Sequence, residues 1–197
     1  MIVCIEGLTN SGKSSICKEI LRNTNYKLAN SLLKEDVVAQ GIKKLTGPIE
    51  NIGKYDKDVE LLLYSTLLSS KANAVMGLQG NVLLDRFTLS VYSYFTGRYS
   101  MDEDIVKRIV DFSSRGIVPD ITFFLDVSLN TIIERKTRSP FSRKDIGIEY
   151  YYHNLREKAI KTIDTFSHNS YVVPCDNKTL DEIYSYISSI MAWRDNE

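Results

Sequence analysis

The chain has 197 residues, of which 43% are apolar, and this is enough to bury one full hydrophobic core. Its 25 basic residues balance its 25 acidic residues, so no charge excess points to nucleic acid or an anionic membrane as a partner. The three cysteines do not have the spacing of metal ligands. No apolar stretch is long enough to span a bilayer, and the chain starts with a strand pattern instead of a basic leader. We therefore expect one domain over 1–197, with reduced thiols, in the cytoplasm.

The predicted elements alternate between strand and helix along the chain. The β-branched run at 1–6 predicts a buried parallel strand, and the apolar spacing over 14–23 predicts a helix after it. The elements expected next are, in order, a weak strand within 25–32, helices over 35–45 and 55–78, a strand over 81–85, helices over 88–96 and 102–114, a strand over 120–126, a helix from 129, a basic loop over 137–145, a helix over 147–166, a strand over 170–174 and a helix over 179–193. Because apolar residues cover most of the circumference of the 55–78 helix, we expect it to be buried. This order is typical of an α/β fold with a parallel sheet.

The stretch EGLTNSGKSS joins the first strand to the first helix and matches a phosphate-binding loop. Gly7 and Gly12 allow backbone conformations that a side chain would forbid, and the loop N–H groups can then surround an anion. In this pattern Lys13 reaches the β- and γ-phosphates and Ser14 binds Mg²⁺. The alternative is an ordinary turn that matches by chance, and the strand before the loop and the helix after it argue against that.

A second signal is the segment LLDRFTLSVYSYF, which ends the strand over 81–85. An Asp at the end of a hydrophobic strand is where such proteins place the carboxylate that orients Mg²⁺, which makes Asp85 the candidate. Arg86 is expected in the same cleft, where a guanidinium suits a phosphate group. The alternative is a surface Asp–Arg pair, which would contribute little.

The segment from Asp85 to Tyr94 resembles the thymidylate kinase family, one of the nucleoside monophosphate kinases. Asp85, Arg86, Phe87, Ser90 and Tyr94 fit the family's pattern in register, and the stretches ELLLYSTLL and VPDITFFLDVSLNTIIER are similar to its substrate helix and to its Pro-Asp strand. The resemblance implies a P-loop kinase fold, with a five-stranded parallel sheet, helices on both faces and a lid at about 136–147. It also implies ATP and Mg²⁺ as cofactors and dTMP as the acceptor.

The resemblance assigns residues to the two nucleotides. The ATP site is expected to comprise Gly7, Leu8, Thr9, Asn10, Ser11, Gly12, Lys13, Ser14, Ser15, Arg135, Asp176 and Asn177. The acceptor site is expected to comprise Thr9, Lys34, Tyr64, Arg86, Ser90 and Tyr94, with Tyr150 or Tyr151 near the sugar after lid closure. By the same resemblance, a homodimer through helices such as the one at 56–76 is expected.

Three positions depart from the family pattern in the acceptor site. Thr9 stands where members carry a carboxylate that meets the sugar 3′-hydroxyl, and Leu68 stands where an Arg contacts a thymine carbonyl. The expected Phe-Pro-x-Arg stretch is missing, which leaves Lys34 as a substitute phosphate contact. The sequence therefore predicts a nucleotide kinase more firmly than a thymine-specific one.

The basic loop over 137–145 is the third signal. In the family that the chain resembles, the Arg that meets the transferring phosphoryl group comes either from the phosphate loop or from the lid. Because Leu8 to Ser11 contain no base, the resemblance implies that this basic loop supplies it. Arg143 and Arg138 are the catalytic candidates, with Lys144 a weaker one. The alternative is a solvated cationic loop without a role.

Two other functions stay open. A deoxynucleoside kinase shares this fold and needs a carboxylate base near the 5′-hydroxyl, for which Glu6 is the only early candidate. A nucleotide-binding module without turnover would explain the missing Arg and carboxylate, although Lys13, Ser14 and Asp85 are present.

Overall fold

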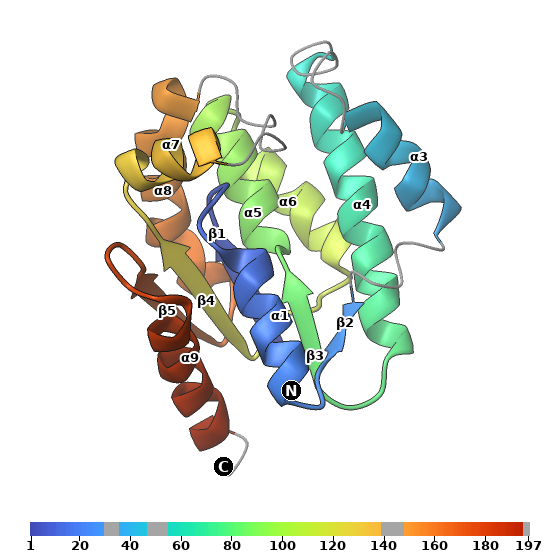
Figure 1. The fold of residues 1–197 in the computed structure, drawn as a ribbon. Helices are drawn as coiled ribbons and strands as arrows, with labels where there is room; N and C mark the ends of the chain where they lie inside the picture. Colours follow the sequence, from blue (N-terminus) through green and yellow to red (C-terminus); the bar gives the residue numbers. More distant parts are fainter. Residues whose placement is uncertain (30–35, 47–54, 139–147, 195–197) are drawn as a thin grey trace.

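The sheet has five strands in the order β2-β3-β1-β4-β5, and each neighbouring pair is parallel (Figure 1). The computed structural model describes residues 1–29, 36–46, 55–138 and 148–194. The strands are β1 (Ile2–Gly7), β2 (Lys27–Leu28), β3 (Val82–Asp85), β4 (Ile121–Asp126) and β5 (Asn169–Pro174). The predicted α/β class and the five-stranded parallel sheet are confirmed.

Helices cover both faces of the sheet. They are α1 (Lys13–Asn23), α3 (Val37–Thr46), α4 (Lys57–Gly77), α5 (Thr88–Ser93), α6 (Glu103–Ser114), α7 (Leu129–Arg138), α8 (Ile148–Thr162) and α9 (Leu180–Arg194). In Figure 1, α1 and α9 pack together in front of the sheet, while α5, α6 and α8 lie behind it. The predicted helices are therefore present, within a few residues of their expected ends.

Three boundaries differ from the sequence prediction. The helix expected over 88–96 is α-helical only as far as Ser93 and continues as the π-helical turn η2 (Tyr94–Arg98). The helix expected over 147–166 ends in the 3-10 turn η3 (Ile163–Phe166). The basic loop begins later than expected, because α7 runs on to Arg138.

The long helix α4 is buried along one side only, so the expectation that it is buried all round is wrong. Leu61, Leu68 and Ala72 are at most 2% exposed, whereas Leu62 is 60% and Met76 66% exposed. In the described part of the chain, no helix is long and apolar enough to cross a membrane.

The central strand β1 places the two sequence motifs at one edge of the sheet. It pairs with β3 on one side and β4 on the other, and its Ile5 lies opposite Asp85 of β3. Both faces of β1 are covered, which explains its continuous apolar run. Because parallel strands end at the same edge, the phosphate loop after β1 and the Asp85–Arg86 turn after β3 lie side by side, where ligands bind in such sheets.

Candidate active site

The loop between β1 and α1 is shaped by two glycines. A Cβ on Gly7 would lie 2.7 Å from the carbonyl oxygen of Leu125, and both Gly7 and Gly12 have positive φ angles, 140° and 102°. Gly12 is also the N-cap of α1 and gives it no side-chain cap. The N-terminus of α1 therefore presents backbone N–H groups at the loop, which suits a phosphate.

Lys13 is the first residue of α1 and is only 6% exposed. Its side chain turns back toward the loop: the ammonium donates to the carbonyl oxygen of Leu8 and lies 3.2 Å from Oγ of Ser11. These contacts keep a buried cation beside the loop, next to where a phosphate chain would lie.

The hydroxyl of Ser14 and the carboxylate of Asp85 are hydrogen-bonded to each other in the lining of the cleft. Oγ of Ser14 donates to Oδ2 of Asp85 at 3.2 Å, although the two residues are 71 positions apart. Hard oxygen donors of this kind fit Mg²⁺, which usually takes one or two protein ligands and completes its shell with waters and phosphate oxygens. Among the described residues, no cluster of three or more His, Cys, Asp or Glu side chains could hold a metal. The pair thus fits a cation held jointly with a nucleotide.

The turn after β3 carries Arg86 in a left-handed conformation, with φ of 63°. Its guanidinium donates to Oγ of Ser90 at 3.1 Å, and both residues line the cleft. The carboxylate of Glu6, which is 1% exposed, accepts hydrogen bonds from the N–H groups of Phe87 and Ser90 at 2.7 and 3.2 Å and from the Ser90 hydroxyl. Glu6 also accepts from the Cys4 thiol, at 3.8 Å. It therefore holds the start of α5, and its carboxylate is already engaged by four donors.

Lys71 of α4 is a site residue that the sequence analysis missed. Its ammonium donates to the carbonyl oxygens of Asp85 and Arg86, at 3.0 and 2.9 Å. Burial lowers the pKa of Lys71, and the nearby carboxylates of Asp85 and Glu6 act in the opposite direction. No sequence signal distinguishes this lysine from the other lysines of amphipathic helices.

A cleft of about 950 Å³ opens between the phosphate loop, α4, α5 and α8. Part of its lining is aromatic, since it includes Tyr64, Tyr94 and Tyr151 together with Leu68. The ring centroids of Tyr64 and Tyr94 are 5.7 Å apart. Tyr151 thus lines the cleft, whereas Tyr150 is 92% exposed and is not among the lining residues.

Arg98 supports this aromatic wall from behind, and the sequence analysis missed it as well. Its guanidinium carbon lies 4.4 Å from the ring centroid of Tyr151 and 5.1 Å from those of Tyr94 and Tyr99. Its Nη1 also donates to the hydroxyl of Tyr94. A guanidinium over aromatic faces is attractive, so Arg98 ties η2 to α8 at the wall of the cleft.

The donor side of the cleft differs in part from the prediction. Nη1 of Arg135 donates to the carbonyl oxygen of Asn10 at 3.0 Å, which places this arginine against the phosphate loop. Lys178, Leu180 and Ile183 line the cleft there. Asp176 and Asn177, which were expected to contact the adenine, are not among its lining residues.

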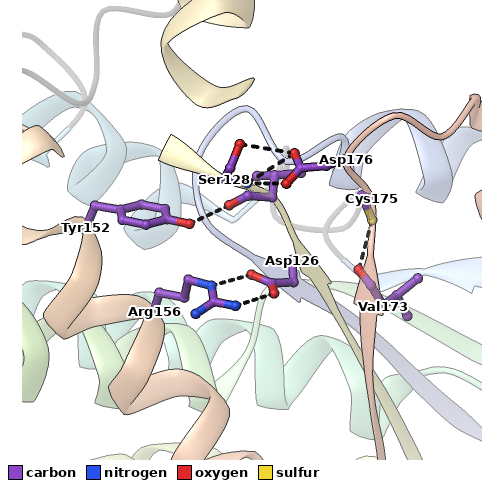
Figure 2. A network of polar contacts seen from close by, with 8 residues as sticks. Asp126, Ser128, Tyr152, Arg156, Val173, Cys175 and Asp176 are labelled. Atoms are coloured by element: carbon purple, nitrogen blue, oxygen red, sulfur yellow. Dashed lines mark hydrogen bonds and ion pairs between the residues drawn. The ribbon is translucent and has the colours of Figure 1, made fainter. Parts of the chain in front are cut away.

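The carboxylate of Asp176 accepts hydrogen bonds at the start of α7 instead of lining the cleft (Figure 2). It accepts from the N–H of Ser128, at 3.0 and 3.1 Å to its two oxygens, and from Oγ1 of Thr131 at 2.6 Å. These bonds hold the start of α7 to the loop after β5. An acidic side chain at a helix N-terminus satisfies its N–H groups, which explains why Asp176 turns away from the cleft.

The same network anchors α8 at the end of β4 (Figure 2). Arg156 binds both carboxylate oxygens of Asp126, at 2.6 and 2.5 Å, and the hydroxyl of Tyr152 donates to the carbonyl oxygen of Val127 at 2.6 Å. Since α8 also carries Tyr151, these bonds fix one wall of the cleft relative to the sheet.

Lys34 and Arg143, and Lys144 beside it, lie outside the described residues, as does the side chain of Arg138. Within the described ranges, the structure brings together the phosphate loop from Gly7 to Ser15, Asp85, Arg86, Ser90, Tyr64, Tyr94 and Arg135 around one cleft.

The cysteines take no part in this site. Cys4, Cys17 and Cys175 are all buried, and burial raises the pKa of Cys175 to about 11. At neutral pH this thiol stays protonated, which makes it a poor nucleophile. The cysteines belong to the core.

The fold and this site define a P-loop nucleotide kinase: a parallel sheet with a glycine loop after β1, a metal-suited Ser–Asp pair, and an arginine that lines the same cleft as several aromatic side chains. A family model described as thymidylate kinase matches residues 5–187. The chain therefore belongs to the thymidylate kinase family.

Curated relatives agree with this membership. The chain is 24% identical to the thymidylate kinase of Legionella pneumophila (strain Paris) over 200 residues, covering 96% of this chain and 93% of the relative. It is 28% identical to that of Buchnera aphidicola subsp. Baizongia pistaciae over 174 residues, covering 83% and 82%. The matches span most of both chains.

Solved structures share the fold. Thymidylate kinase from Candida albicans matches with a TM-score of 0.70 at 19% identity, covering 99% of this chain and 92% of that one. Deoxyadenosine kinase from M. mycoides matches with a TM-score of 0.70 at 21% identity, covering 98% of both chains. The fold alone thus accommodates both kinds of kinase, and the family match identifies this chain as a nucleoside monophosphate kinase that uses ATP and Mg²⁺.

Proposed function

We propose that this chain transfers the γ-phosphoryl group of ATP to dTMP, giving ADP and dTDP, with the residues of the cleft in defined roles. Family membership gives the reaction. The observation that supports the site most strongly is the 3.2 Å approach of Ser14 to Asp85, with Arg86 next in the chain and lining the same cleft as Tyr64 and Tyr94. A metal-suited pair and an arginine suited to phosphate thus line one cleft, which supports the roles proposed for them.

On the donor side, the loop N–H groups and Lys13 hold the β- and γ-phosphates. Ser14 and Asp85 hold Mg²⁺, which when bound neutralises charge on those phosphates. Arg135 lies against the loop at Asn10 and flanks the adenine. Arg143, or else Arg138, supplies the further cation that the loop itself lacks.

On the acceptor side, Arg86 binds the monophosphate and Ser90 orients that guanidinium. Tyr64 stacks on the base, Tyr94 packs against the sugar, and Thr9 hydrogen-bonds the 3′-hydroxyl. Lys34 gives a second contact to the monophosphate.

The competing function, a deoxynucleoside kinase, needs a carboxylate that can take a proton from a 5′-hydroxyl. Glu6 is the early candidate, yet its carboxylate is 1% exposed and already accepts from Phe87 and Ser90. A 5′-hydroxyl would have to displace Phe87 or Ser90 to reach these oxygen atoms. This geometry favours a monophosphate acceptor over a free nucleoside.

Arg86→Met tests this acceptor role. Removing hydrogen bonds to a charged phosphate should raise KM for dTMP by about 10–100-fold while leaving the Kd for ATP within about threefold. Steady-state kinetics and calorimetric ATP titration give the two numbers, and Arg108→Met, an exposed arginine on α6, is the matched control. A rise in the Kd for ATP with no change in KM for dTMP would place Arg86 on the donor side instead.

We further propose a cytoplasmic homodimer that contacts neither nucleic acid nor membrane. Exposed apolar side chains of α4, among them Leu62 and Met76, support self-association, because burying them in a partner removes apolar surface from water. Three buried free thiols suit a reducing compartment.

A further inference from the structure

The turn that carries Arg86 is held in a conformation that costs energy. The φ angle of Arg86 is 63°, in the left-handed region that residues with a side chain rarely adopt. Such a conformation persists only where neighbouring groups fix it. The N–H of Arg86 donates to the backbone of β1, at the carbonyl oxygen of Ile5, at 3.0 Å.

Lys71 fixes the two peptide groups on either side of Arg86. The carbonyl oxygen of Asp85 belongs to the peptide that enters Arg86, and the carbonyl oxygen of Arg86 belongs to the peptide that leaves it. The ammonium of Lys71 donates to both, at 3.0 and 2.9 Å. A single side chain from the middle of α4 thus restrains both rotations about the Cα atom of Arg86.

Glu6 holds the same segment from the other side. Its carboxylate accepts from the N–H groups of Phe87 and Ser90, which follow Arg86 in the chain. The segment is thus clamped by a cation on its carbonyl groups and an anion on its N–H groups. Their opposite charges stabilise one another in a cleft where either alone would be costly.

We propose that Lys71 is a positioning residue for phosphoryl transfer: by bonding both peptides that flank Arg86, it aims the Arg86 guanidinium at the phosphate of the acceptor. This proposal rests on the acceptor role proposed above for Arg86. Lys71 acts through Arg86 and needs no contact with either nucleotide. Its removal should therefore affect use of the monophosphate and spare the binding of ATP.

A double-mutant cycle tests the proposal, with kcat/KM for dTMP measured at saturating ATP. Lys71→Met should lower kcat/KM by about tenfold in the otherwise unchanged enzyme, because the turn loses two charge-assisted bonds. In the Arg86→Met background the same substitution should change kcat/KM by less than about twofold, because the side chain that it positions is gone. The Kd for ADP, measured by calorimetry, should stay within about twofold in Lys71→Met.

Two further variants serve as controls for the double-mutant cycle. Lys57→Met removes an exposed lysine near the start of the same helix and should leave kcat/KM unchanged. Lys71→Arg keeps donors at the end of a long stem and should recover part of the loss. If Lys71→Met does not fold, as judged by its thermal transition, Lys71→Gln takes its place in the cycle.

Equal losses in both backgrounds would overturn the proposal, since Lys71 would then act independently of Arg86. A Lys71→Met enzyme with unchanged kcat/KM would overturn it too. If Arg86→Met alone leaves kcat/KM for dTMP unchanged, the acceptor role of Arg86 fails, and that failure is separate from any result for Lys71.

Discussion

At the scale of single residues, Lys13 offers a direct test of the phosphate loop. Lys13→Met removes the ammonium but keeps most of the buried stem, so the fold should survive. Losing one contact to developing charge typically costs about 2.7–4 kcal/mol, so kcat should fall by about 10²–10³. Lys18→Met, an exposed lysine on the same helix, is the control. A Lys13→Met enzyme with near-normal kcat would show that the loop does not bind the transferring phosphate.

A second prediction at the scale of single residues concerns Leu68 and how strongly the enzyme discriminates between acceptor bases. It is 2% exposed, lines the cleft and cannot hydrogen-bond a thymine carbonyl as the family's Arg does. A site rejects a wrong substrate strongly when that substrate leaves one of its buried polar groups without a hydrogen bond. An apolar side chain such as Leu68 imposes no such penalty. We expect kcat/KM for dUMP within about 100-fold of that for dTMP. A dUMP value at least a thousandfold lower would mean that another residue reads the base.

Sequence reasoning found the residues whose spacing is tied to chemistry, and it missed those defined only by tertiary structure. The glycine loop, Asp85 and Arg86 could be predicted because each follows a strand in a known order. Lys71 could not, because nothing in a helix sequence tells which turn of the chain a lysine will meet. Asp176 was placed in the adenine site by resemblance alone, whereas its bonds to α7 depend on how two loops approach.

At the scale of elements, the contact between η2 and α8 shapes the acceptor wall. A Cβ on Gly97 would lie 2.8 Å from Cα of Leu155 and 3.1 Å from the carbonyl oxygen of Asn154. These are backbone atoms of α8, so Gly97→Ala has to push the two elements apart. Overpacking of this kind typically costs about 1–3 kcal/mol, which for a chain of this size lowers Tm by about 2–12 °C.

A matched glycine separates this packing effect from helix propensity. Gly41 lies within α3, and a Cβ there would meet nothing within 4 Å. Gly41→Ala should therefore raise the free energy of unfolding by about 0.5–1 kcal/mol, the usual gain in a helix. Thermal denaturation of both variants measures the difference. If Gly97→Ala is as stable as Gly41→Ala, the close contact between η2 and α8 is not needed for stability.

Most elements could be predicted because their patterns are local. The strands β1 and β4 are buried on both faces and read as continuous apolar runs, and α6 has one apolar side. The π-helical turn η2 could not be predicted from the pattern, because it depends on the approach of α8 at Gly97. The extent of burial of α4 was also overestimated, since its composition does not tell which of its apolar residues meet neighbours.

At the scale of the whole molecule, the parallel sheet brings the parts of the site together. The order β3-β1-β4 places the ends of β1 and β3 next to each other, so the phosphate loop and the Asp85–Arg86 turn share one cleft. Residues of α4, η2 and α8 form part of the wall of that cleft, and in the proposed function the acceptor binds beside them. A relative with the same fold acts on a nucleoside, so the fold by itself does not select the acceptor.

The choice of acceptor is therefore the central claim, and one comparison tests it: ADP formation from ATP and Mg²⁺ with dTMP against thymidine, each followed to its phosphorylated product. Because Arg86 lines the cleft and is proposed to bind the acceptor's phosphate, and because Glu6 is engaged by backbone donors, we predict that dTMP is converted to dTDP with a kcat/KM at least about 100-fold above that for thymidine. Conversion of thymidine to dTMP at an equal or higher kcat/KM would contradict the account and identify the cleft as that of a nucleoside kinase.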